Sequence, residues 1–145
     1  MKAITRLAAL LGTAFSSAPE GWSTDLEAAF KEAKEKDKPV LVEFTGSDWC
    51  PPCIAMRENV FSKKEFVEQA SKDFILVELD FPRKDKELAK KNEPYAEKYE
   101  IEGFPTVILF DSDGEEFTRF FASEHPTVEK FLAHLEKSLE NKDLL

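Results

Sequence analysis

Two cysteines, Cys50 and Cys53, are the residues of this chain whose type and spacing point most directly to chemistry, and no other cysteine occurs among its 145 residues. Cysteines separated by two residues on the first turn of a helix can close a small disulfide ring. If the sulfur of Cys50 attacks a disulfide in a partner protein, the sulfur of Cys53 can then resolve the mixed disulfide. The spacing therefore predicts a redox-active dithiol.

The segments on either side of this pair predict a strand followed by a helix. Residues 40–45 are mostly β-branched and aromatic, which is typical of a strand, and residues 54–60 have helix-forming composition. Cys50 then falls at or just before the helix N-terminus, where free backbone N–H groups and the helix dipole favour a thiolate. A lowered thiol pKa makes a cysteine a better nucleophile at neutral pH. Pro51 and Pro52 suit the first helical positions, because their missing N–H groups have no intrahelical partner there.

Two other roles fit a cysteine pair, namely inert core residues or half of a zinc site. A four-ligand zinc site needs a second pair of cysteines or histidines at suitable spacing. No further cysteine is present, and His125 and His134 are far away in the sequence. The sequence therefore favours the redox pair and predicts no metal site.

Three further features, taken together with the cysteine spacing, resemble the thioredoxin family. They are an acid and an aromatic residue near the end of the strand (Glu43-Phe44), Trp49 directly before the cysteine motif, and Gly103-Phe104-Pro105-Thr106 before an apolar strand. The resemblance covers residues 22–139. It implies an α/β architecture, the thioredoxin fold, with a central mixed β-sheet flanked by helices on both faces. It also implies a thiol:disulfide oxidoreductase without a cofactor, in which Cys50 is the nucleophile and Cys53 the resolving cysteine.

The resemblance implies roles for the residues around the pair. Pro105 would be cis and lie against the cysteines, and Phe104 would flank the groove and offer backbone hydrogen bonds to a substrate strand. Trp49 would form a wall of the site, with simple core packing as the alternative. Glu43 would be a buried acid that accepts a proton from Cys53, the alternative being a strand residue that faces solvent.

Glu78 departs from the family pattern, because many thioredoxins have a lysine at the corresponding strand position. Two carboxylates close together would raise the pKa of one of them further. The alternative is that Glu78 faces outward, and the sequence leaves both open.

The residues between the cysteines bear on the direction of electron flow. Pro51 and Pro52 carry no N–H, and neither position holds a histidine, so the Cys50 thiolate loses donors that would stabilise it. We therefore predict a moderately raised thiol pKa and a reductase or isomerase rather than an oxidase. Its partners would be protein disulfides or dithiols and a membrane thiol-transfer protein as electron donor. No dimerisation segment is evident, so we expect a monomer.

A hypothesis of a different class is a thioredoxin-fold binding protein without turnover. A copper(I) carrier would use Cys50, Cys53 and Met56, because soft thiolate and thioether ligands suit that ion. Loss of dithiol turnover together with tight copper binding would support it.

Composition sets the broad limits. The length fits one domain, and 42% hydrophobic residues with 13 phenylalanines supply a core. The formal charge of −9 argues against a general binder of nucleic acid or anionic membranes.

The N-terminus, residues 1–18, predicts a secretory signal peptide, with an ordinary amphipathic helix as the alternative. Lys2 and Arg6 give a positive start, residues 7–15 are apolar but too short to span a bilayer, and small residues end at Ala18. Cleavage near Ala18 would leave residues 19–145 as a thioredoxin-like domain in the periplasm or outside the cell. In that compartment a cysteine pair is more often a redox pair than a metal site.

The rest of the sequence predicts the other helices and strands. Capping boxes at Thr24–Glu27 and Ser62–Glu65 predict two helix starts. The nearly continuous apolar run 74–80 predicts a strand buried on both faces and paired in parallel with residues 40–45. Further predicted elements are a surface helix at 86–91 that continues over 95–99, a hairpin of 107–110 with 115–121, and a helix over 128–139.

Overall fold

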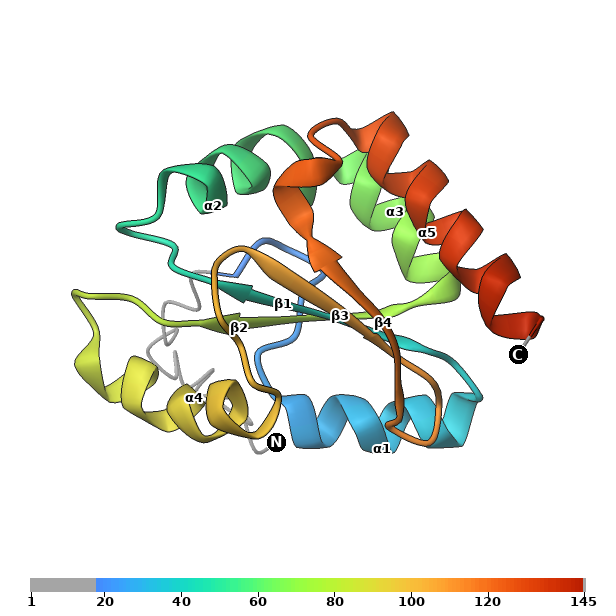
Figure 1. Ribbon diagram of the computed structural model, residues 1–145, viewed down its shortest axis with the longest axis horizontal. Coiled ribbons are helices and arrows are strands. Elements are labelled where there is room, and N and C mark those ends of the chain that lie inside the picture. The colour runs from blue at the N-terminus through green and yellow to red at the C-terminus, as the bar shows by residue number, and fades with distance from the viewer. Residues whose placement is uncertain (1–17, 145) are drawn as a thin grey trace, which may run out of the picture.

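A four-stranded mixed sheet forms the centre of the molecule, in the strand order β2-β1-β3-β4. The computed structural model describes residues 18–144 (Figure 1). β1 (Val40–Thr45) pairs in parallel with β2 (Ile75–Asp80) and antiparallel with β3 (Thr106–Phe110). β4 (Glu116–Phe121) completes the hairpin with β3. The predicted parallel pair and the predicted hairpin are both confirmed.

The outer edge of β2 is covered by the segment that precedes the first helix. Ser23 forms a parallel bridge with Val77: its N–H donates to the Leu76 carbonyl at 2.8 Å and its carbonyl accepts from the Glu78 N–H at 2.8 Å. Part of the exposed strand edge is thereby paired, which removes a site for unwanted strand addition.

The helices cover both faces of the sheet, as predicted (Figure 1). One face carries α1 (Leu26–Lys36) and α4 (Lys86–Lys98). The other face carries α2, α3 and α5. Their bounds are Pro51–Met56 for α2, Lys64–Asp73 for α3 and Val128–Asp143 for α5. Two short segments complete this side, the π-helical turn η1 (Arg57–Phe61) and the 3-10 turn η2 (Ala122–Glu124).

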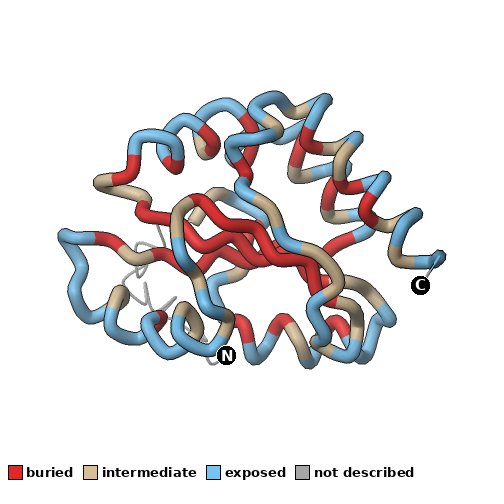
Figure 2. Tube along the Cα trace, viewed as in Figure 1, coloured by how far each residue is buried: buried red, intermediate tan, exposed pale blue. Residues whose placement is uncertain are grey.

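Side-chain alternation along the strands divides the core into two layers. Val40, Val42 and Phe44 of β1 pack toward α1, whereas Leu41 packs toward α3 and α5. The strands are buried throughout except for β4, which lies at an edge (Figure 2). Glu43 alternates with Val42 and Phe44 and therefore points to the side of the sheet that α2 covers.

Both predicted capping boxes are wrong in detail. The N-cap of α1 is Asp25, whose carboxylate accepts from the Ala28 N–H at 3.0 Å, because this acid is one residue nearer the helix than Thr24. The N-cap of α3 is Lys63, without a side-chain bond. The Ser62 hydroxyl instead donates to the Arg57 carbonyl at 2.6 Å, so it closes η1 rather than opening α3.

The predicted signal peptide lies almost entirely outside the described residues, of which Ala18 is the first. Its presence and its cleavage therefore remain predictions. Between residues 18 and 144, no helix combines the length and the apolar character needed to cross a bilayer.

Candidate active site

The strand-to-helix junction places Cys50 at the N-cap of α2, with Pro51 as the first helical residue. Its backbone is extended (φ −98°, ψ 106°), and its carbonyl accepts the first helical hydrogen bond, from the Ile54 N–H at 3.0 Å. Cys53 follows within the same turn, with a Cα–Cα distance of 5.2 Å, and the two form a disulfide. The predicted location of the pair is confirmed.

The two sulfurs have different surroundings. Cys50 is 4% exposed and its Sγ lies 4.0 Å from the Phe104 carbonyl oxygen. Cys53 is only 1% exposed, and its Sγ accepts from the Gly46 N–H at 3.4 Å. Cys50 is thus the outer sulfur and Cys53 the inner one, which suits attack by Cys50 followed by resolution by Cys53.

The Phe104–Pro105 peptide bond is cis and sets Phe104 beside the cysteine motif. The Phe104 ring meets Trp49 edge to face at a centroid distance of 5.7 Å. Trp49 is partly exposed, and its Nε1 donates to the Phe81 carbonyl at 2.8 Å. The structure therefore brings together Trp49, Phe104, Pro105 and the cysteines, while a role in binding substrate remains a prediction.

The loop before the motif is held to the loop that follows β2. The Asp48 carboxylate accepts from the N–H groups of Arg83 and Lys84, each at 2.9 Å, and these bonds lower the pKa of Asp48. The Arg83 guanidinium lies 4.7 Å from the centroid of the Trp49 ring. These contacts form a clamp between the two loops and hold Trp49, the predicted wall of the site.

Glu43 is buried, with 2% exposure, and its Oε2 has no hydrogen-bond partner. Burial raises the pKa of Glu43 well above its ordinary value, the neighbouring Glu78 and Asp80 raise it further, and Arg57 opposes them. The solvent-facing alternative for Glu43 is therefore wrong. A buried carboxyl with a raised pKa is suited to proton transfer near neutral pH.

Glu78 also faces inward, which settles the question that the sequence left open. It lies directly beside Glu43 in the parallel register of β1 and β2. Its carboxylate accepts from the Arg57 guanidinium at 2.5 Å; burial raises the pKa of Glu78 and Arg57 lowers it in part. Two residues further along β2, Asp80 accepts from the Ser47 N–H at 3.0 Å.

A family model for a thioredoxin-like domain matches residues 26–139. The chain belongs to the thioredoxin-like family. It is 35% identical to the disulfide bond reductase DsbH of Chlamydia pneumoniae over 101 residues, which are 68% of this chain and 60% of DsbH. It is 30% identical to the thioredoxin-related protein DsbJ of the same organism over 101 residues, 68% of this chain and 29% of DsbJ. The chain thus spans less than two thirds of either relative.

A solved structure of a DsbH oxidoreductase superimposes on this thioredoxin-like chain with a TM-score of 0.72 at 27% identity. That match covers 86% of this chain and 89% of the solved one. The predicted fold is confirmed.

Three functional candidates of this thioredoxin-like chain were absent from the sequence predictions, namely Arg57, Asp80 and Arg83. Arg57 follows Cys53 by four residues, and residues four apart share one face of a helix, so this spacing could have identified it. No comparable local signal marks Asp80 or Arg83, since the Asp80 carboxylate and the Arg83 N–H have partners 33 and 35 residues away in the chain.

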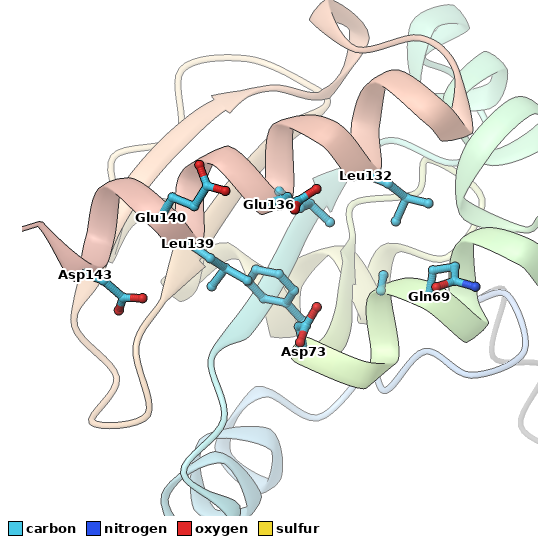
Figure 3. Close-up of a pocket in the computed structure, with 10 residues that line it drawn as sticks. Gln69, Asp73, Leu132, Glu136, Leu139, Glu140 and Asp143 are labelled. Carbon is cyan, nitrogen blue, oxygen red and sulfur yellow. The ribbon is translucent and has the colours of Figure 1, made fainter.

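A hollow of about 380 Å³ between α3 and α5 lies apart from this site (Figure 3). Apolar side chains form its floor, and acidic ones, among them Glu136 and Asp143, stand at its rim. None of the residues that line it belongs to the predicted site of this thioredoxin-like chain.

Proposed function

We propose that this chain is an exported thiol:disulfide oxidoreductase that reduces disulfides in client proteins. The observation that carries the proposal is the Cys50–Cys53 pair at the N-terminus of α2, with the outer sulfur facing the Phe104 carbonyl. The resemblance to a protein named as a disulfide bond reductase supports the same direction.

In the reaction, the Cys50 thiolate attacks one sulfur of the client disulfide. The client S–S bond breaks, one client thiolate leaves, and a mixed disulfide joins Cys50 to the client. Cys53 then gives its thiol proton to the Glu43 carboxylate and attacks the Cys50 sulfur. The second client thiolate leaves, so the client has gained two electrons and the enzyme holds the Cys50–Cys53 disulfide seen in the structure.

The direction follows from the dipeptide between the cysteines. Pro51 and Pro52 offer no N–H to the Cys50 thiolate, so the reduced form is stabilised less and the pair is the better reductant. We expect a reduction potential near the roughly −270 mV of thioredoxin rather than the roughly −120 mV of DsbA, measured by equilibration with glutathione. A value close to that of DsbA would overturn the reducing direction.

The proposed setting is the periplasm or the extracellular space, after removal of residues 1–18. A reductase there needs electrons from outside that compartment. A membrane thiol-transfer protein would supply them to the Cys50–Cys53 disulfide. The mature protein, residues 19–145, would act as a monomer. Secretion of a fusion to residues 1–18, followed by N-terminal sequencing of the product, tests the export proposal directly.

Reduction of insulin in the presence of dithiothreitol tests the activity. We expect turnover by the wild type and none by Cys50→Ser, whereas Cys53→Ala should accumulate clients disulfide-linked to Cys50. Tight copper(I) binding without turnover would favour the carrier hypothesis instead. Met56, its suggested third ligand, is buried in the core against α3 and α5.

A further inference from the structure

Three carboxyl groups are buried beneath α2 at the carboxyl ends of β1 and β2. Glu43 and Glu78 are direct neighbours in the parallel register, and Asp80 lies on the same side of β2, two residues beyond Glu78. The positive charge that acts on Glu43 and Glu78 comes from Arg57 in η1. Arg57 follows Cys53 by four residues, so the cation comes from the turn directly after α2, the helix that carries the inner cysteine.

Two neighbouring carboxylates in a water-poor environment do not both ionise freely, and they titrate as a coupled pair. Arg57 makes the two carboxyls differ in how readily they ionise. Its guanidinium bonds to Glu78 at 2.5 Å, whereas the Glu43 Oε2 has no hydrogen-bond partner. An ionised carboxylate is favoured where a cation bonds to it and disfavoured where an oxygen is buried unpaired.

We propose that Arg57 is a positioning residue for the exchange reaction, because its ion pair with Glu78 places the shared proton of the two carboxyls on Glu43. The inference rests on the proposed function of the Cys50–Cys53 pair and on the proposed role of Glu43. Glu78 then serves as a fixed negative charge beside Glu43, and Glu43 is the member that exchanges a proton with Cys53.

The consequences of removing each partner differ. Arg57→Gln takes the cation from Glu78, so Glu78 competes for the proton and the two carboxyls titrate in overlapping steps. Glu78→Gln takes a like charge from beside Glu43 and leaves the cation, so Glu43 ionises at lower pH. Asp80, which also raises the pKa of Glu43, and the Cys53 thiol are unchanged in both variants.

The test is the titration of the carboxyl carbons in ¹³C-glutamate-labelled protein, with Glu43→Gln and Glu78→Gln assigning the two signals. In the wild type we expect a pH interval in which Glu43 is protonated while Glu78 is ionised. In Arg57→Gln we expect the Glu78 titration to move up by about 1 pH unit or more. Arg57→Lys keeps the charge and should restore the wild-type order. An unmoved Glu78 titration in Arg57→Gln overturns the inference.

If Arg57→Gln does not fold, Arg57→Gln combined with Glu78→Gln supplies a second variant. This pair of neutral side chains leaves no uncompensated charge at position 78, where the carboxylate is buried, and removing both partners of such an ion pair is far less damaging than removing one. Glu43 should then titrate in one step, at a pH between its values in the wild type and in Glu78→Gln. A Glu43 titration identical to that of Glu78→Gln would show that Arg57 does not act on the pair.

The pH dependence of kcat/KM for disulfide reduction separates this inference from the proposed function. We expect the limb governed by Glu43 to move to lower pH in Glu78→Gln, to split into two steps in Arg57→Gln and to stay in place in Arg57→Lys. Absence of turnover by the wild type at every pH would overturn the proposed function, while the carbon titrations would still decide the placement of the proton. If the pH profile of turnover were the same in the wild type, Glu78→Gln and Arg57→Gln, the positioning role of Arg57 would be overturned.

Discussion

The two faces of the central sheet are built from the same strands but differ in what they bury. Toward α1 and α4, β1 and β3 present no charged side chain, and the apolar ones on this side are Val40, Val42, Phe44, Ile108 and Phe110. Toward α2, the same strand β1 presents Leu41 and then Glu43, and β2 presents Leu76 and then Glu78 and Asp80. Buried charge in β1 and β2 is therefore confined to one face and to the carboxyl ends of these two parallel strands, where the loop to the cysteines begins. Both faces therefore contribute an apolar core, and the face toward α2 also carries the buried carboxyls beneath the cysteine pair.

The largest expected effect is a loss of stability on the apolar face. Phe110 is fully buried in β3 and packs edge to face on Phe30 and Tyr99, each at a centroid distance of 5.1 Å. Phe110→Ala should lower the free energy of unfolding by about 3–5 kcal/mol, because it removes the ring and leaves a cavity. Urea denaturation of the oxidised protein measures this, and disulfide reduction per folded molecule should not change.

Phe121 is the matched control in the same hairpin. Its side chain is 47% exposed, so Phe121→Ala should change the free energy of unfolding by about 0.5 kcal/mol or less. An equal loss of stability in the two variants would contradict the assignment of Phe110 to a tightly packed face. A loss of activity per folded molecule in Phe110→Ala would contradict the separation of the two faces.

The second effect concerns the charged face and depends on pH. The pKa of Glu43 is raised in the folded protein above its ordinary value of 4.5, so the folded state holds this proton more tightly than the unfolded chain. The stabilisation is complete below that ordinary value and is lost as the pH rises through the folded pKa. Glu43→Gln removes this loss, so the variant should be more stable than the wild type by about 1–3 kcal/mol at pH 9 and similar to it at pH 4.

Urea denaturation of the oxidised protein from pH 4 to pH 9 measures the slope. Glu65→Gln is the control, because Glu65 is exposed at the start of α3 and its carboxylate is solvated in both states. The same Glu43→Gln variant should reduce disulfides more slowly, so stability and activity move in opposite directions. A variant that is less stable than the wild type at pH 9 would contradict the destabilising effect of the buried, ionised Glu43 carboxylate.

The site was predictable from the sequence where its signals are local. The strand before Cys50, the helix after Cys53 and the prolines between them lie within about twenty residues, and each follows from composition and spacing. The ion pair of Arg57 with Glu78 was not predictable in the same way. It depends on the register of β1 against β2, and a slip of one residue would turn Glu78 to the opposite face.

The clamp between the two loops illustrates the same limit. Asp48 caps the backbone of Arg83 and Lys84, residues that follow a different strand. A partly exposed aspartate in a loop has many possible donors, and only the arrangement of β1 and β2 selects these two. Long-range polar contacts therefore required the structure, whereas the strands at 40–45 and 74–80 followed from their apolar composition.

The smallest effect concerns the helix start on the apolar face, where two adjacent residues can both act as N-cap. The structure selects Asp25 over Thr24, so Asp25→Ala should lower the free energy of unfolding by about 1 kcal/mol, because the Ala28 N–H loses its acceptor. Thr24→Ala is the matched control and should change the free energy of unfolding by about 0.5 kcal/mol or less, measured by thermal or urea denaturation.

Ser62→Ala, at the other predicted capping box, should leave the start of α3 intact, since that hydroxyl bonds to the Arg57 carbonyl in η1. If Thr24→Ala proved the more costly change, the helix would begin one residue earlier, and the spacing of Leu26, Ala29 and Ala33 toward the apolar face would have to arise from a different cap.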